Sequence, residues 1–254
     1  MIDPTEAARR FARDGVLHVA GFLSPAKVDE LEGQLARYRR EVVPTVPPGD
    51  AFCETAGDLA TLKQLQRIDQ HDRWFAEWAA GPQLAELAAA LLEQPVRVQG
   101  VEWFNKPARI GRPTPPHQDG YYFCLAPDEA VTLWIALADV DLENGCLHYA
   151  LGSHRQGIRP HGVSPILGFS QTVLDFDPAA CAPDETFVAR LSRGDLVVHH
   201  SATIHWAGAN ASDRPRPSAA VVYFSGRARR DEAAFARYQA SSEAQQRELG
   251  ALVR

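Results

Sequence analysis

The spacing of hydrophobic and polar residues divides the chain into an N-terminal part with helical spacing and a longer part with strand-like spacing. The clearest helix opens at Ser24-Pro25, and its apolar face would carry Val28, Leu31, Leu35 and Tyr38. Further helices are predicted from a cap at Asp3 to Gly15, near residues 73–80, and over 82–93. A short strand is predicted at 16–22. Residues 1–95 are therefore expected to form a mostly helical buttress.

Between residues 96 and 225 the pattern changes to short β-type runs separated by Gly, Pro, Asn and Asp. These runs are VRVQGVEWF, YYFCL, VTLWIALADV, GCLHYAL, TFVARL, DLVVHH and SAAVVYF. VTLWIALADV is apolar on both alternating faces, which predicts a central strand covered on each side. The fold class is thus mainly β with flanking helices, a sandwich or barrel. Residues 226–254 are expected to add a C-terminal helix, and the whole chain, 1–254, is interpreted as a single domain.

Residues 43–62 interrupt the helical part with a segment that contains Pro44, Pro47, Pro48 and Gly49. Such a composition is typical of a loop, and two interpretations are open. The segment is either a mobile lid over a site or a passive connector.

Composition and charge narrow the classes of function. The 254 residues carry a formal net charge of −6 without a visible basic run, which argues against nucleic-acid binding. No apolar stretch approaches the roughly 18 to 20 residues of a membrane-spanning helix, and the charged start lacks a signal-peptide core, so we expect no membrane partner and a cytoplasmic location. The four cysteines are too few for a disulfide framework and too widely spaced for a cysteine metal site. A small-molecule substrate is the expected partner, and the oligomeric state is open.

The tripeptide His117-Gln118-Asp119 is the first candidate for chemistry. Positions i and i+2 of a strand point to the same side, so His117 and Asp119 would lie side by side. With one more histidine they would form a two-histidine, one-carboxylate facial triad, which binds non-haem Fe(II) and leaves coordination positions open. The pair alone is a weak signal, because such pairs are common in polar loops.

The second candidate is the stretch DLVVHHSATIHW, which is followed by Arg214 and Arg216 at the start of an apolar strand. His199 and His200 are adjacent in a β-type run, so at least one of them faces away from any site. His205 is either a ligand or a hydrogen-bonded core residue. An arginine at the start of a buried strand requires an anion, since an unpaired guanidinium in a core is costly.

The chain resembles the phytanoyl-CoA dioxygenase (PhyH) family of Fe(II)- and 2-oxoglutarate-dependent oxygenases. The similarity covers most of the chain, from FARDGVLHVAGFLSPAKVDEL and FNKP to three more specific blocks. These are PPHQDGYYF, VTLWIALADVDLENGCLHYALGSHRQG, and GDLVVHHSATIHWAGAN with RPRPSAAVVYF. One departure is Ala207, which stands where relatives often have a serine.

The resemblance implies a double-stranded β-helix, a cupin-like jelly roll. His117, Asp119 and His205 match the family's iron ligands, which would make them the catalytic residues. Arg216 matches the arginine that holds the far carboxylate of 2-oxoglutarate, and Arg214 is a weaker match. Further positions that match cosubstrate surroundings are Gln118, Trp134, Asn105 and Lys63.

The function that the resemblance implies is hydroxylation of an unactivated C–H bond, with Fe(II), 2-oxoglutarate and O₂ as cofactor and cosubstrates and with succinate and CO₂ as coproducts. A small polar metabolite is the preferred substrate, because no basic patch for CoA is visible. Two alternatives stay open: a non-catalytic sensor of 2-oxoglutarate or another small molecule, and a cupin-like enzyme with a different metal. The substrate's identity, and the choice between hydroxylation and desaturation or rearrangement, lie beyond the sequence.

Overall fold

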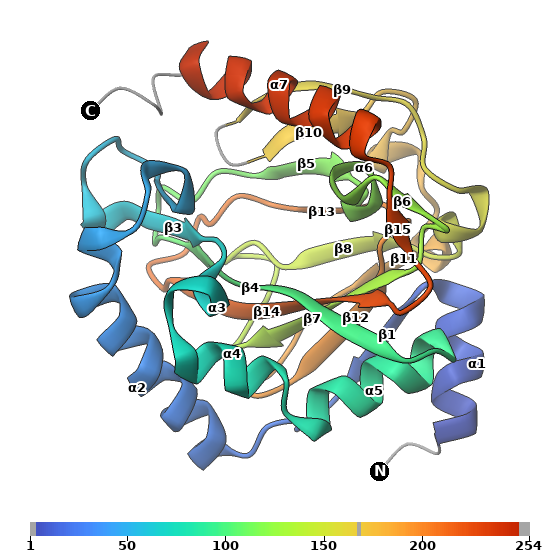
Figure 1. Cartoon of the computed structure of the whole chain (residues 1–254), viewed down its shortest axis with the longest axis horizontal. Helices are drawn as coiled ribbons and strands as arrows, with labels where there is room; N and C mark the ends of the chain where they lie inside the picture. Colours follow the sequence, from blue (N-terminus) through green and yellow to red (C-terminus); the bar gives the residue numbers. More distant parts are fainter. Residues whose placement is uncertain (1–3, 167–168, 249–254) are drawn as a thin grey trace.

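Two antiparallel β-sheets that face each other form the centre of the computed structural model, which describes residues 4–166 and 169–248 (Figure 1). The larger sheet has the order β1 (Val16–Val19), β12 (Leu196–His200), β7 (Ala130–Ala136), β14 (Arg216–Ser225), β4 (Val96–Lys106), β3 (Leu62–Leu65) and β2 (Ala51–Cys53). The smaller sheet has the order β11 (Thr186–Val188), β8 (Leu147–Ala150), β13 (His205–Ala207) and β5 (Thr114–His117). The predicted double-stranded β-helix is confirmed.

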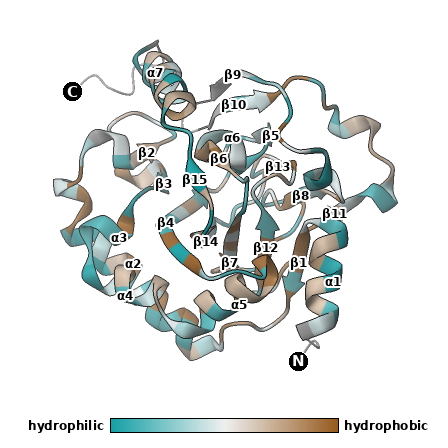
Figure 2. Ribbon diagram, turned by 45° about the vertical axis from the view of Figure 1, so that its right-hand side comes forward, coloured by the Kyte–Doolittle hydropathy of each residue, from teal (hydrophilic) through white to brown (hydrophobic). Residues whose placement is uncertain are grey.

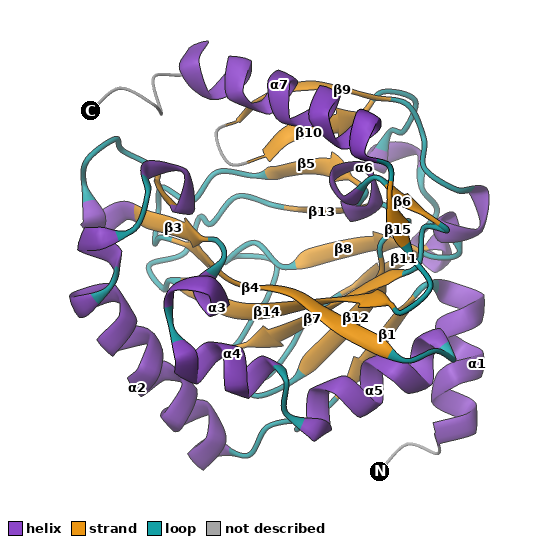
Figure 3. Cartoon of the chain, viewed as in Figure 1, coloured by secondary structure: helices purple, strands orange, loops and turns teal. Residues whose placement is uncertain are grey.

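Helices cover the outer face of the larger sheet (Figure 3). They are α1 (Pro4–Asp14), α2 (Pro25–Glu41), α3 (Ile68–His71), α4 (Arg73–Ala79) and α5 (Pro82–Leu92). One apolar cluster joins these helices to the strands, from Phe11 and Leu35 to Leu133 and Val221. The helical part and the barrel therefore share a core, and the single domain stays a prediction. None of the described helices has both the length and the apolarity needed to cross a membrane.

Local sequence signals explain where the N-terminal helices begin and end. The Ser24 side chain accepts a hydrogen bond from the Lys27 amide, and Pro25 opens α2, whose predicted apolar face is buried. Gly15 follows α1 with a φ of 73°, and a Cβ there would lie 2.4 Å from the His154 ring. Only glycine combines this backbone conformation with this close approach. The predicted cap at Asp3 lies outside the described residues.

The central strands present different chemistry on their two faces. On β4, Val101 and Trp103 face the helices, whereas Glu102 and Phe104 face the interior of the barrel. Figure 2 shows that hydrophobic (brown) and hydrophilic (teal) residues follow one another along β4. The whole of β7 is buried between β12 and β14, which confirms the predicted central strand. The polar groups inside the barrel thus lie on the opposite side of the sheet from an apolar face that packs against the helices.

Three predictions of local structure were wrong or incomplete. The run YYFCL is largely helical, because α6 (Asp119–Phe123) occupies most of it. Residues 43–62 contribute β2, which pairs with β3 and extends the larger sheet beyond β4. The hairpin of β9 (His161–Ile166) and β10 (Phe169–Val173) was not predicted at all. Whether residues 43–62 move as a lid stays a prediction.

The remaining elements close one end of the barrel. Helix α7 (Glu232–Glu248) confirms the predicted C-terminal helix, and it packs on α6 and β9 (Figure 1). Strands β6 (Leu125–Ala126) and β15 (Arg229–Arg230) form a short pair. Single 3-10 turns lie at Val43–Thr45, Pro48–Asp50, Leu59–Thr61, Ser153–Gln156, Pro178–Ala180 and Pro183–Glu185.

Candidate metal centre

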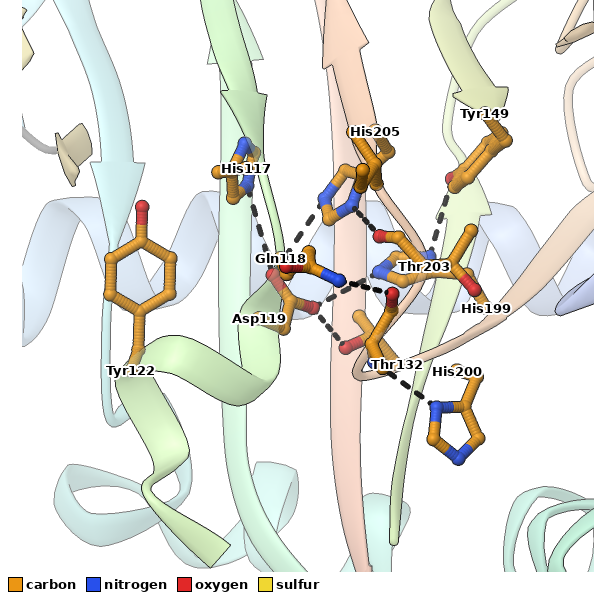
Figure 4. A network of polar contacts seen from close by, with 12 residues as sticks. His117, Gln118, Asp119, Tyr122, Thr132, Tyr149, His199, His200, Thr203 and His205 are labelled. Atoms are coloured by element: carbon orange, nitrogen blue, oxygen red, sulfur yellow. Dashed lines mark hydrogen bonds and ion pairs between the residues drawn. The ribbon is translucent and has the colours of Figure 1, made fainter. Parts of the chain in front are cut away.

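Two histidines and an aspartate meet inside the barrel, at the end nearest α6. His117 ends β5, His205 begins β13, and the two residues are direct partners across these paired strands. Asp119 lies in the first turn of α6. Its Oδ1 is 3.7 Å from Nε2 of both His117 and His205, and the three donor atoms all lie within 4.8 Å of one another (Figure 4).

The junction between β5 and α6 brings His117 and Asp119 together. The sequence argument placed both residues in one strand, and that geometry was wrong, because the strand ends at His117. The chain turns into a helix immediately afterwards, and this turn directs the carboxylate back toward the imidazole. His117 and Asp119 are therefore close, as predicted, but a strand–helix junction brings them together instead of a continuous strand.

Backbone carbonyls fix the orientation of both imidazole rings. His117 Nδ1 is 2.8 Å from the Pro115 carbonyl, and His205 Nδ1 is 3.0 Å from the Thr203 carbonyl. A carbonyl oxygen only accepts, so each Nδ1 carries the proton and donates it. Each Nε2 is then left with a lone pair that faces Asp119, which is the arrangement that a divalent metal requires of histidine ligands.

The second oxygen of Asp119 is held by two side chains that do not belong to the predicted triad. Thr132 Oγ1 donates to Oδ2 at 2.7 Å, and His199 Nε2 donates to it at 3.0 Å. The Tyr149 hydroxyl in turn contacts His199 Nδ1 at 3.3 Å. These contacts leave Oδ1 facing the two imidazoles. The sequence offered His199 only as one of two adjacent histidines and did not predict this contact with Asp119.

Burial sets the protonation of the cluster. It lowers the pKa of His117, and it lowers the pKa of His205 well below the ordinary value, so both rings are neutral at pH 7. Burial would raise the pKa of Asp119, but the imidazoles of His205 and His199 hold it below the usual range. Two neutral nitrogens and one carboxylate oxygen are the donor set that Fe(II) takes in a facial triad.

A small cavity of about 80 Å³ opens on one side of the cluster and contains an unpaired buried cation. The Arg216 side chain is 4% exposed, and within the described chain its Nε and Nη1 have no hydrogen-bond partner. Lys106 lies directly opposite on β4, and burial followed by the charge of Arg216 lowers its pKa well below the ordinary value. Two close cations without enough anions favour a bound carboxylate.

Three of the other predicted cosubstrate residues line this same cavity. The Arg216 guanidinium lies 5.1 Å from the ring centre of Trp134. Asn105 donates to the Leu62 carbonyl, and its Oδ1 is buried without a partner among the described residues. Lys63 Nζ lies 3.3 Å from Glu54, which also contacts Arg112. The cavity thus retains more positive than negative side chains.

The structure does not bring Gln118 and Arg214 into the cavity. Gln118 is fully buried behind the cluster, where its amide donates to the Gly157 and Ala202 carbonyls and its oxygen accepts from the Arg159 amide. All of its polar atoms are engaged, so its predicted contact with a cosubstrate is not supported. Arg214 lies on the surface and pairs with Asp141 at 2.7 Å.

Ala207, the departure from the family pattern, packs in an apolar cluster with Trp134 and Ala220. Carbon atoms therefore surround the position at which a relative's serine hydroxyl would lie.

A larger cavity of about 420 Å³ opens on the opposite side of His117 and Asp119. Its walls come from β2, β3, β4, α6 and α7, and they combine aromatic with polar side chains. Phe104 and Thr132 line both cavities and separate them. The cluster therefore has a small cationic cavity on one side and a larger mixed cavity on the other.

Comparison with known proteins places this arrangement in a family. The family model of phytanoyl-CoA dioxygenase (PhyH) matches residues 11–218. Phytanoyl-CoA dioxygenase domain-containing protein 1 of Danio rerio is 35% identical over 158 residues, which are 59% of this chain and 52% of that protein. The peroxisomal phytanoyl-CoA dioxygenase of Rattus norvegicus is 25% identical over 237 residues, 86% of this chain and 67% of that protein. The chain spans about half the length of several curated relatives that it matches.

Solved structures with 2-oxoglutarate show the same architecture. The epimerase SnoN, in complex with Fe3+, alpha ketoglutarate and nogalamycin RO, is 28% identical with a TM-score of 0.69, over 89% of this chain and 84% of that one. EvdO2 from Micromonospora carbonacea var. aurantiaca, complexed with 2-oxoglutarate, is 27% identical with a TM-score of 0.69, over 89% and 92%. The histidine and aspartate donors fit iron, and the unpaired arginine fits a carboxylate. This chain belongs to the phytanoyl-CoA dioxygenase family.

Proposed function

We propose that the protein is an Fe(II)- and 2-oxoglutarate-dependent dioxygenase that hydroxylates a C–H bond of a small polar metabolite, with release of succinate and CO₂. The observation that carries this proposal is the position of the cluster of His117, Asp119 and His205 between two cavities of different chemistry. The cationic cavity suits the dianionic cosubstrate, and the larger cavity suits the prime substrate.

Each side chain has a defined task under this proposal. His117 and His205 present neutral Nε2 atoms to iron, and Asp119 presents Oδ1 while Thr132 and His199 hold its Oδ2. Arg216 binds the far carboxylate of 2-oxoglutarate, and the guanidinium rests against Trp134. Asn105 and Lys63 lie along the same wall and would contribute further polar contacts.

Iron in this site would supply oxygen activation coupled to decarboxylation of 2-oxoglutarate. The chain itself positions the cosubstrate and the substrate and shields them. Phe104, which lines both cavities, keeps the cosubstrate and the substrate apart, and Tyr122 and Phe123 of α6 close the substrate side. A volume of about 420 Å³ accommodates a compact metabolite. Because SnoN is described as an epimerase, the same centre supports outcomes other than hydroxylation, and product analysis must decide among them.

The test is formation of succinate from 2-oxoglutarate by the Fe(II)-loaded protein under air, with and without a panel of small polar metabolites. We expect slow turnover alone and faster turnover with a substrate. Asp119→Ala should abolish both rates, whereas Arg214→Met, which alters a surface arginine, should retain them. Full succinate formation by Asp119→Ala would refute the assignment. Tight 2-oxoglutarate binding without turnover on any compound would favour a sensor, and activity with another metal but without iron would favour a different metalloenzyme.

A further inference from the structure

Strand β4 carries a carboxylate in the larger cavity that the reaction chemistry does not use. Glu102, Phe104 and Lys106 alternate along the inner face of this strand, since side chains two positions apart share a face. Lys106 lines the small cationic cavity, Phe104 lines both cavities, and Glu102 lines the larger one. The strand thus places opposite charges on opposite sides of the metal cluster.

Glu102 is partly buried in the cavity wall and has no charged partner among the described residues. The Gln64 amide lies 3.5 Å from its carboxylate, at the outer limit of a hydrogen bond. Among the described residues, no arginine, lysine or histidine lies within ion-pair distance of its carboxylate, and its strand partner is the small Ala220. Burial, followed by the charge of Asp119, raises the pKa of Glu102 to about 7. An uncompensated carboxylate in a cavity wall is costly unless a ligand supplies a positive charge.

Aromatic rings make up much of the rest of the wall. The rings that line the same cavity belong to Phe52, Phe104, Tyr122, Phe123, Phe235 and Tyr238. The faces of such rings attract ammonium groups, and a carboxylate beside them strengthens that attraction. Arg67 also lines the cavity, but its guanidinium is committed to Asp50 and to the Gly49 carbonyl. Burial and Asp119 raise the pKa of Glu102 by more than the charge of Arg67 lowers it.

We propose that Glu102 and the aromatic walls around it bind a positively charged nitrogen, so that the prime substrate is an organic ammonium compound. This inference rests on the proposed function, because it assigns the larger cavity to the prime substrate. It narrows the small polar metabolite to a cationic one. An anionic substrate is disfavoured beside Glu102, which lines this cavity.

The test uses n-butylammonium as a cationic probe and 1-butanol as a neutral probe with the same number of heavy atoms. Binding is measured by ligand-observed NMR at pH 8 on the full chain loaded with Zn²⁺ and 2-oxoglutarate, so that no turnover is needed. We expect the wild type to bind the ammonium at least tenfold more tightly than the alcohol. Glu102→Gln should lose at least tenfold in ammonium affinity, while its affinity for the alcohol changes less than twofold.

The matched control is Glu243→Gln, which removes an exposed carboxylate at the rim of the same cavity that pairs with Arg247 at 3.2 Å. It should change ammonium binding less than twofold. Glu102→Asp keeps the charge and should keep the preference for the cation, even if Glu102→Gln does not fold. Equal affinity for the two probes, no detectable ammonium binding, or an equal loss in Glu243→Gln overturns the inference. Failure of the proposed function is a separate result, because it appears as absence of succinate formation by the iron-loaded wild type.

Discussion

Replacement of Arg216 by methionine should make the protein more stable in the absence of 2-oxoglutarate and insensitive to its addition. The guanidinium is buried against Trp134 with two nitrogens unpaired among the described residues, so the empty site contains an uncompensated charge. Methionine fills a similar volume without that charge. Arg216 is thus expected to lower the free energy of unfolding until an anion binds to it.

The magnitude follows from the surroundings of Arg216. Burial lowers the pKa of this guanidinium from 12.5 to about 10, which corresponds to roughly 3 kcal/mol of unfavourable charge burial at pH 7. Loss of the contact with Trp134 offsets about 1 kcal/mol of the gain from removing the charge. The variant should therefore gain about 2 kcal/mol, or about 4–8 °C in Tm for a chain of this size. Ligand at a hundredfold excess over its Kd should stabilise the wild type by about 2.7 kcal/mol.

The assay is thermal and urea unfolding of both proteins with Zn²⁺ bound, with and without 2-oxoglutarate. The order of stability should invert: the variant is more stable without the ligand and loses its advantage when the ligand is present. Arg214→Met serves as control, because this exposed arginine pairs on the surface and should change stability by less than about 1 kcal/mol. A variant that is less stable than the wild type without ligand, or that is stabilised equally by it, would refute the reasoning.

Three further predictions concern the metal cluster and a nearby carboxyl. His117→Ala should lose bound metal on dialysis, as measured by metal analysis, and retention of one equivalent would contradict the ligand assignment. His199→Leu should weaken metal binding about 10- to 100-fold in chelator competition, because one contact that holds Asp119 is lost. Burial raises the pKa of Asp128 to about 6, so its folded form keeps a proton that the unfolded form releases near pH 4, and stability falls as pH rises between these values. Asp128→Asn should therefore remove up to about 3 kcal/mol of this fall between pH 4 and pH 8 in urea unfolding, and an unchanged pH dependence would contradict the assignment.

The cluster of His117, Asp119 and His205 could be predicted because metal chemistry restricts the residue types more strongly than strand geometry does. His117 and Asp119 were selected on the assumption of a continuous strand, yet they meet at a strand–helix junction. The choice of His117 and Asp119 does not require a continuous strand, since any tight local turn that keeps an imidazole and a carboxylate on one side allows both to bind the same ion. Arg216 was predictable for a similar reason, because an arginine at the start of a buried strand requires an anion.

Contacts that depend on the register between paired strands of the barrel could not be predicted from the sequence. His199 reaches Asp119 only because β12 pairs with β7, which places His199 opposite Thr132. Gln118 seemed a site residue from its position between two ligands, but the turn directs it toward the Ala202 carbonyl. The strands at 51–53 and 62–65 were missed because runs of three and four residues are too short to show a period.

The inner face of β4 explains how one barrel can order two small ligands around a single ion. Glu102 and Lys106 are four residues apart, which in an extended strand corresponds to about 13 Å. At an effective dielectric constant near 20, a unit charge is worth about 1 kcal/mol at that separation and about 4 kcal/mol at contact distance. An anion beside Arg216 is therefore strongly favoured there, while Glu102 repels it from the larger cavity. Under both proposals, Arg216 would favour 2-oxoglutarate in the small cavity and Glu102 would favour a cationic substrate in the larger one.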